Sequence, residues 1–364
     1  MPTRRKFIRD AARAMAGVAF TGCGLLDALP ALAQAKPRRE VMVAGRRAKV
    51  IDVHAHCVIP EAVSVMGQKL QQEPTAVRGQ ARMAIVLAER LGAMDEQGID
   101  MEVLSINPSW YRLERDVVEK AIRINNEGLA DLCGKHPDRF AAFASLGLQF
   151  PDLAVQQLEY AMKKLGLRGA AIGGSVAGEE FADPKFHPVW AKAEELGAVL
   201  FIHPQSTPEL AKRFRGNGWL SNTIGNPLDT TIALSHLIFQ GTLDRFPGLK
   251  ICSAHGGGYL PSYAPRSDHS CFVSPAGCDP NITLKKKPTE YLKQLYFDSL
   301  VFTSEALRHL AAEVGTSQIV IGTDHPIPWN EKAVDHVLGT GSLSDAEKAA
   351  ILGGNAAKLL GIKI

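Results

Sequence analysis

Short apolar, β-rich runs alternate with helical segments along this chain, and this alternation limits the fold more than any other feature. Between most of the runs lie segments whose apolar residues are spaced by three and four positions, at residues 83–97, 117–133, 153–165 and 188–196. Short buried strands separated by helices are typical of parallel β/α units. The sequence therefore predicts an α/β fold, a closed (β/α)8 TIM barrel. The expected strands cover residues 50–53, 101–106, 140–148, 169–172, 198–202, 250–253, 296–302 and 318–321.

The first 35 residues have the order of an export leader. Arg4 and Arg5 precede a mildly apolar stretch, and Ala33-Gln34-Ala35 forms a small-x-small cleavage site before Lys36. A twin arginine followed by an apolar segment resembles the signal of the twin-arginine pathway. The alternative is a basic amphipathic helix. We expect a signal peptide at residues 1–35 and a barrel domain at residues 36–364. The protein is then periplasmic, or cytoplasmic if the leader is not used.

The formal net charge of the chain falls to zero when the leader is left out of the count. The chain has 41 Lys and Arg and 38 Asp and Glu; five and two of these lie in the leader, which leaves 36 of each. No basic stripe remains, so we expect no nucleic-acid partner. Gly and Asp inside the apolar stretch argue against a permanent membrane span. The remaining residues are enough for one large core.

Cysteine use does not indicate a disulfide scaffold. Cys23 lies in the leader, and the five remaining cysteines contain no CxxC motif. Cys271 and Cys278 could close a small loop in an oxidising compartment. The twin-arginine route exports folded proteins, so the core is expected to form with reduced thiols. Whether these two cysteines pair stays open.

Ligand-type side chains stand at the ends of four predicted strands. The first strand ends in His54-Ala55-His56, and residues two apart in a strand point to the same face. The fifth ends in His203, the sixth in His255 and the eighth in Asp324. Each alone reads as a core or loop residue. Because the carboxyl ends of barrel strands meet at one rim, together they predict a metal site.

Three imidazoles and one carboxylate, from His54, His56, His203 and Asp324, suit one Zn²⁺ ion with a bound water. Mn²⁺, Fe²⁺ and Co²⁺ are compatible with the same donors. The fourth strand contains no lysine that could bridge two metals, so one ion is the simpler interpretation. His255 is then free to take a proton from the metal-bound water, whose pKa the ion lowers towards neutrality.

These residues resemble the amidohydrolase superfamily, in particular its branch of 2-amino-3-carboxymuconate-6-semialdehyde decarboxylase and related aromatic-acid decarboxylases. The resemblance covers roughly residues 48–362 and implies a barrel, a single metal and non-oxidative loss of CO₂. Its anchors are IDVHAHCVIP (51–60), MDEQGIDMEVLS (94–105), FIHP (201–204), GNPLDTTIAL (225–234), FPGLKICSAHGGGYLP (246–261), YFDSLVF (296–302), IGTDHPIP (321–328) and GGNAAKLLGI (353–362).

The resemblance also implies roles. His54, His56, His203 and Asp324 match the metal ligands, and His255, acting with Asp324, matches the catalytic base. Arg266 falls at an arginine that holds a substrate carboxylate, often across a dimer interface, which implies a homodimer. Asp298 is expected to orient a ligand from behind, and Asn226 to cap a helix or contact substrate.

Two positions depart from the family pattern. Gln205 stands where relatives carry an aromatic residue after His-Pro, which replaces a stacking wall by a hydrogen-bonding amide at the substrate. A second carboxylate-binding arginine is expected in the loop after the first strand. Arg78 and Arg82 are candidates, although this loop does not align well.

The sequence thus predicts a metal-dependent decarboxylase of a small aromatic or unsaturated carboxylic acid. The alternative is a metal-dependent hydrolase or hydratase acting on a lactone, an amide or an unsaturated acid, because the same ligands serve both. A third interpretation, a non-catalytic barrel subunit, disagrees with the complete ligand set.

Overall fold

The computed structural model describes residues 38–69, 83–205, 208–329 and 331–363. The chain divides into two units, Met1–Pro37 and Arg38–Ile364. The predicted signal peptide lies outside the described residues, so the description below concerns the second unit.

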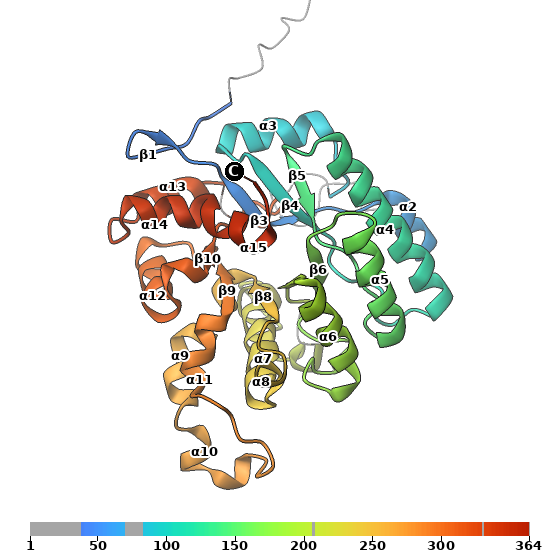
Figure 1. The fold of residues 1–364 in the computed structure, drawn as a ribbon, viewed down its shortest axis with the longest axis vertical. Coiled ribbons are helices and arrows are strands. Elements are labelled where there is room, and N and C mark those ends of the chain that lie inside the picture. Colours follow the sequence, from blue (N-terminus) through green and yellow to red (C-terminus); the bar gives the residue numbers. More distant parts are fainter. Residues whose placement is uncertain (1–37, 70–82, 206–207, 330, 364) are drawn as a thin grey trace, which may run out of the picture. The chain divides into compact units, whose positions relative to one another are not determined.

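Eight parallel strands form the barrel, in agreement with the sequence (Figure 1). One sheet has the order β3-β4-β5 and the other β10-β9-β8-β7-β6. Parallel bridges between Ala144 and Ala170, and between Ala55 and His325, join the two sheets at both edges and close the barrel. The strands are β3 (Ile51–His56), β4 (Met101–Ser105), β5 (Phe140–Ala142), β6 (Gly169–Ile172), β7 (Val199–Ile202), β8 (Lys250–Ser253), β9 (Leu295–Asp298) and β10 (Ile319–Val320). A short hairpin, β1 (Met42–Val43) and β2 (Arg46–Arg47), precedes them.

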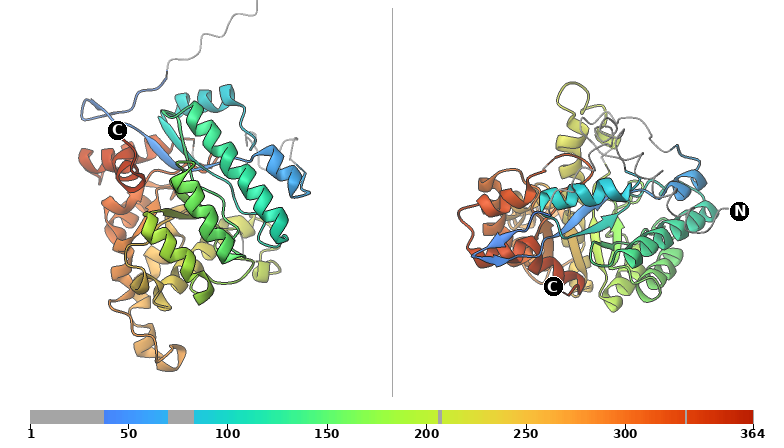
Figure 2. Two further views of the ribbon diagram at one scale, coloured as in Figure 1. Left: turned by 45° about the vertical axis from the view of Figure 1, so that its right-hand side comes forward. Right: turned by 90° about the horizontal axis from the view of Figure 1, so that it is seen from above.

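Helices lie outside the strands (Figure 2). Those predicted from apolar spacing are present with slightly different ends: α3 (Leu87–Gln97), α4 (Arg115–Lys135), α5 (Pro151–Lys163) and α6 (His187–Leu196). The remaining barrel helices are α2 (Pro60–Val65), α7 (Asn226–Phe239), α8 (Thr242–Arg245), α12 (Ser304–Val314), α13 (Ala333–Gly339), α14 (Asp345–Ala349) and α15 (Asn355–Leu360). Ser344 and Glu347 form a capping box at the start of α14. A π-helical turn, Ala350–Gly354, interrupts the path to α15.

The barrel interior is filled by alternate residues of the strands. Ile51, Val53, Phe143 and Phe201 belong to one buried cluster, in which the two phenylalanine rings stack with centroids 5.5 Å apart. The larger cluster packs the strands against the helices. The register between β3 and β4 shifts between Asp52 and Ala55. Such an irregularity changes the direction of the side chains at the end of β3.

Two long segments that follow β7 and β8 are partly helical. Residues 204–226 contain a 3₁₀ turn at Pro208–Leu210 and a π-helical turn at Ser221–Gly225. Residues 259–288 form α9 (Leu260–Ser267), α10 (Ser270–Val273) and a 3₁₀ turn at Pro275–Gly277, before α11 (Pro288–Tyr291). We call residues 268–287 the arm; α10 extends away from the barrel at the bottom of Figure 1.

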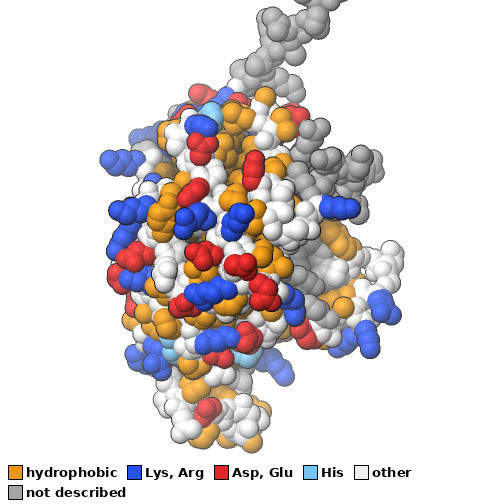
Figure 3. Space-filling model, turned by 90° about the vertical axis from the view of Figure 1, so that its right-hand side faces the viewer, with side chains coloured by type: hydrophobic (Ala, Val, Ile, Leu, Met, Phe, Trp, Pro, Cys, Tyr) orange, Lys and Arg blue, Asp and Glu red, His pale blue; other side chains and the backbone are white. Residues whose placement is uncertain are grey.

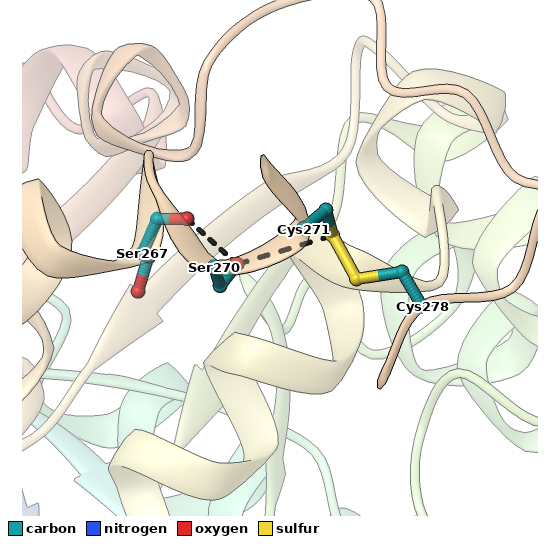
Figure 4. Close-up of a disulfide and its surroundings, with 4 residues drawn as sticks. All are labelled: Ser267, Ser270, Cys271 and Cys278. Carbon is teal, nitrogen blue, oxygen red and sulfur yellow. Dashed lines mark hydrogen bonds between the residues drawn. A yellow bond between two sulfur atoms is a disulfide. The ribbon is translucent and has the colours of Figure 1, made fainter. Parts of the chain in front are cut away.

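Cys271 and Cys278 form a disulfide in the arm, with Cα atoms 5.7 Å apart (Figure 4). The pairing that the sequence left open is therefore present. Ser270 donates a 2.8 Å hydrogen bond to the carbonyl of Ser267 beside it. Within the described residues the free cysteines, Cys57, Cys133 and Cys252, belong to the barrel unit.

No helix within the described residues is long and apolar enough to cross a membrane. On the face shown in Figure 3, Lys and Arg side chains are interspersed with Asp and Glu. This mixture agrees with the balanced charge that the sequence gives for the chain after residue 35.

Candidate active site

Four ligand-type side chains from three parts of the chain converge at the carboxyl ends of the strands. His54 and His56 end β3, His203 follows β7, and Asp324 follows β10. Each is at least nine-tenths buried. One nitrogen or oxygen atom from each lies within 4.8 Å of the others, so the four residues could hold a metal ion. The structure thus brings together the set expected from the sequence.

The two histidines of β3 point their Nε2 atoms at one place. His54 donates from Nδ1 to Asp298 at 2.6 Å. Ser105 donates its hydroxyl proton to the carbonyl of Ala55, so its oxygen accepts from Nδ1 of His56 at 2.9 Å. In the neutral forms with Nδ1 protonated, the Nε2 lone pairs of His54 and His56 face each other at 3.1 Å and face Oδ1 of Asp324 at 3.2 and 2.9 Å. Facing lone pairs repel, and a shared cation removes that repulsion.

His203 gives a second indication that a cation belongs here. Both of its ring nitrogens are buried and have no hydrogen-bond partner. Buried polar atoms are seldom left unsatisfied. The imidazole rings of His203 and His56 have centroids 4.4 Å apart, and one ring nitrogen of His203 lies within 4.8 Å of the other three donor atoms. The donor set fits a divalent metal ion.

The electrostatics of the cluster also favour a cation. Burial lowers the pKa of His54, but Asp324 and Asp298 outweigh burial and raise it to about 10. Burial lowers the pKa of His203 well below its ordinary value, which keeps that imidazole neutral and able to act as a ligand. The carboxylates therefore attract positive charge, whereas His203 does not retain a proton.

Asp298 connects a candidate ligand to the segment that carries His255. Its Oδ2 accepts from His54, and its Oδ1 accepts from the backbone N–H of Gly256 at 2.9 Å. A Cβ atom on Gly322 would lie 2.8 Å from Cβ of Asp298 and 2.9 Å from Cβ of His54. Only glycine fits beside this pair. The expectation that Asp298 supports a ligand agrees with this geometry.

His255 lies at the edge of the cluster. Its Nε2 is 3.7 Å from Oδ2 of Asp324, and its buried Nδ1 has no partner. Both residues have positive φ angles, 55° for His255 and 65° for Asp324, which non-glycine residues seldom adopt. Such strain is concentrated at functional sites. His255 is therefore close enough to exchange protons at the cluster without being one of the four converging donors.

A buried polar network that the sequence analysis missed supports the cluster from below. Arg90 of α3 donates to Glu102 of β4 at 2.6 Å and to the carbonyl of His56 at 2.9 Å. The other carboxylate oxygen of Glu102 accepts from His325 at 2.7 Å. The network thus holds the backbone of His56, a candidate ligand, and also His325, the residue after the candidate ligand Asp324. Glu102 lies in the quoted MEVLS strand, where a charged residue in a buried run was the available signal.

A cavity of about 360 Å³ opens beside His255. This volume suits a small ligand with one ring. Within the described part of the chain, its lining includes no Lys, Arg, Asp or Glu. Most of the lining is apolar, from Leu300, Val301, Phe302, Leu310 and Trp329, with polar groups from Asn222, Asn226, Ser262 and His309.

The residues predicted to bind substrate do not all line the same cavity. Asn226 lines the cavity with His255. Gln205 instead lines a neighbouring cavity, and its side-chain amide donates to the carbonyl of Pro108. Arg266 is exposed on α9 and is absent from the lining of its own cavity. Arg78 and Arg82 lie outside the described residues.

Trp219 and Trp329 form a feature that had no signal in the sequence. Their rings stack at 5.6 Å, and Phe302 contacts Trp329 edge-on at 6.1 Å. The stack joins the segment after β7 to the segment after β10. Trp329 and Phe302 both line the cavity, so aromatic side chains from other loops border it although residue 205 is a glutamine.

A closed parallel barrel with imidazole and carboxylate donors at its strand ends defines a class of metal-binding enzymes. The amidohydrolase family matches residues 51–362, and the chain belongs to this family.

The relatives are named decarboxylases. The chain is 32% identical over 277 residues to 2-amino-3-carboxymuconate-6-semialdehyde decarboxylase of Dictyostelium discoideum, covering 75% of this chain and 76% of that protein. The structure resembles that of 5-carboxyvanillate decarboxylase from Sphingomonas paucimobilis, with a TM-score of 0.78, 26% identity, and coverage of 87% of this chain and 100% of that one. A dihydroxybenzoic acid decarboxylase from Polaromonas sp. JS666, solved with manganese and the inhibitor 2-nitroresorcinol, gives a TM-score of 0.74 at 26% identity, covering 86% and 97%.

Proposed function

We propose that this protein is a metal-dependent decarboxylase that releases CO₂ from a small aromatic or unsaturated carboxylic acid without a redox cofactor. His54, His56, His203 and Asp324 would hold one divalent ion. The observation that carries the proposal is the convergence of these four buried side chains, with His203 unpartnered, beside a cavity whose described lining is uncharged. The named activities of the relatives support loss of CO₂ over addition of water.

The residues of this chain divide the chemistry between them. When bound, the metal supplies a Lewis acid that holds and polarises a substrate oxygen. His255 gives a proton to the ring carbon that bears the carboxylate. The bond from that carbon to the carboxylate then breaks, its electron pair returns to the ring, and CO₂ leaves. Asp324, 3.7 Å from His255, stabilises the protonated imidazole before the transfer.

We propose zinc as the ion, because three imidazoles and one carboxylate suit it. Manganese is the rival, since it is bound in the Polaromonas structure. Elemental analysis of protein purified without added metal distinguishes them. One equivalent of zinc per chain would support the proposal, whereas one equivalent of manganese per chain would identify manganese as the ion instead.

We propose that the protein is a homodimer in which Arg266 of one subunit binds the carboxylate of the substrate held in the other subunit. Arg266 is exposed, and within the described residues the cavity beside His255 has no cationic lining. A guanidinium from outside the chain would supply the missing positive charge. Asn226 lies at the same cavity and is proposed to contact the substrate.

Assay of CO₂ release from a panel of hydroxybenzoic acids tests the function directly. Mass analysis of the products separates the two candidate activities, because a decarboxylase product loses a carboxyl group whereas a hydrolase or hydratase product gains water. Products that gain water, with no CO₂ released, would replace the proposed reaction by the alternative.

A further inference from the structure

Ser262 and His309 form a polar pair in the otherwise mainly apolar part of the cavity. Ser262 lies on α9 and His309 on α12. The serine Oγ and the imidazole Nε2 are 3.1 Å apart, and both residues line the cavity that also contains His255. A ligand that extends from the metal site past His255 into this cavity would therefore meet the pair.

The pair has hydrogen-bonding capacity left over. A serine hydroxyl has one proton and two lone pairs, and the contact with His309 uses only one of these three. A small group that both donates and accepts would fit between such partners. A hydroxyl is the simplest group of this kind.

The charge next to the pair favours a neutral group over an anion. Nδ1 of His309 is 4.0 Å from Oε1 of Glu313. Glu305 is also near enough that His309 lowers the pKa of its carboxyl group, after the larger effect of its hydrogen bond with Arg308. Glu305 is paired with Arg308 through both of its carboxylate oxygens, so Glu313 is the carboxylate that disfavours a second carboxylate on the ligand, and the polar pair suits a neutral substituent.

We infer that Ser262 and His309 form a subsite that recognises a ring hydroxyl of the substrate, away from the carboxylate. This inference rests on the proposed function, because it places the reacting carboxylate near His255 and the metal ligands. The ring then lies against Leu300, Val301 and Trp329, and its far hydroxyl reaches the polar pair. The subsite would select among hydroxylated acids according to whether a hydroxyl far from the carboxylate can reach Ser262 and His309.

The test compares ligand pairs that differ by one hydroxyl. Salicylic acid and its further hydroxylated derivatives share the group beside the carboxylate and differ only on the rest of the ring. We expect wild-type metal-loaded protein to prefer at least one dihydroxy acid over salicylic acid by about fivefold to tenfold in binding and in kcat/KM, the range of one net hydrogen bond. His309→Phe should abolish this preference, and Ser262→Ala should reduce it.

His236→Asn is the matched control. His236 lies on α7, is 40% exposed against 43% for His309, and faces Glu180 at 3.9 Å, but it does not line the cavity. This variant should keep the wild-type preference. A ratio between paired ligands does not depend on the fraction of folded protein, so instability of a variant leaves the comparison valid.

Calorimetric binding separates failure of the subsite from failure of the proposed function. Selective binding without CO₂ release overturns the decarboxylase and supports the subsite. CO₂ release with equal preference in wild type and His309→Phe overturns the subsite and supports the decarboxylase. Absence of binding by every acid in the panel overturns the subsite.

Discussion

Asp298 and His54 are joined by a 2.6 Å hydrogen bond between Oδ2 and Nδ1, and both side chains are fully buried. This contact fixes Nε2 as the nitrogen of His54 that faces the other three candidate metal ligands. Asp298→Asn is expected to weaken metal affinity by about tenfold to a hundredfold, because a support behind a ligand both orients it and raises its basicity. Competition titration with a chromophoric chelator measures this change. Asp131→Asn, an exposed carboxylate paired with Lys135, is the control; equal affinity in wild type and Asp298→Asn would contradict the prediction.

His255 is expected to act in proton transfer rather than in metal binding. His255→Asn should lower kcat by about a hundredfold to ten-thousandfold, the usual contribution of a general acid or base. Its metal content should match that of wild type, because Nε2 of His255 lies outside the converging donors. Elemental analysis together with a CO₂ assay checks both parts. Loss of the metal in this variant would instead identify His255 as a ligand.

The buried pair of Arg90 and Glu102 is expected to stabilise the fold. Glu102→Gln leaves a buried guanidinium without its carboxylate, which costs about 3–5 kcal/mol in the free energy of unfolding. Arg90→Met combined with Glu102→Gln should cost less, because the unpaired charge is gone. Urea unfolding of metal-free protein at pH 7 measures both, with the exposed Glu159→Gln as a control expected to change little.

The same pair predicts a dependence on pH. Burial raises the pKa of Glu102, but Arg90 and His325 outweigh burial and hold it below its ordinary value of 4.5. A carboxyl group with a lowered folded pKa contributes stability above its unfolded pKa, and this contribution is lost as pH falls through the folded value. The stability difference between wild type and Glu102→Gln should therefore narrow below about pH 4. A constant difference from pH 7 to pH 3 would show that Glu102 does not titrate in this way.

Arg266 is expected to act in the partner's site. Arg266→Ala and His255→Asn should each be inactive alone. If the dimer is symmetric, mixing them by unfolding and refolding should restore about a quarter of wild-type activity, because half of the random dimers contain one site with both intact residues. Sedimentation analysis confirms the dimer. An inactive mixture of folded dimers would place Arg266 and His255 in the same chain's site, whereas activity of Arg266→Ala alone would place Arg266 outside the mechanism.

Export and the disulfide can be tested on the same preparation. We expect protein recovered from the periplasm to begin at Lys36. Alkylation after denaturation should label three cysteines without reductant, Cys57, Cys133 and Cys252, and five with it. Changing Arg4 and Arg5 to Lys should block export and leave the leader attached. An unprocessed chain in the periplasm would contradict the predicted cleavage site.

Much of the fold and of the candidate metal site follows from local pattern. Buried strands and amphipathic helices have different periodicities, so the eight strands and four of the helices could be read along the chain. Parallel strands meet at one rim, which is why His54, His56, His203 and Asp324 could be grouped without coordinates. The long segments at residues 204–226 and 259–288 lack a clear periodicity, and their π-helical turn and helical arm were not predicted.

Contacts between distant segments were decided only by the tertiary structure. The hydrogen bonds of Asp298 and Ser105 select the tautomers of His54 and His56, and no spacing in the sequence records them. The link from Arg90 through Glu102 to His325 spans three elements, and the Trp219–Trp329 stack and the Ser262–His309 pair each join two. Such contacts depend on how whole elements pack in three dimensions, whereas strand ends and ligand types are written in the order of neighbouring residues.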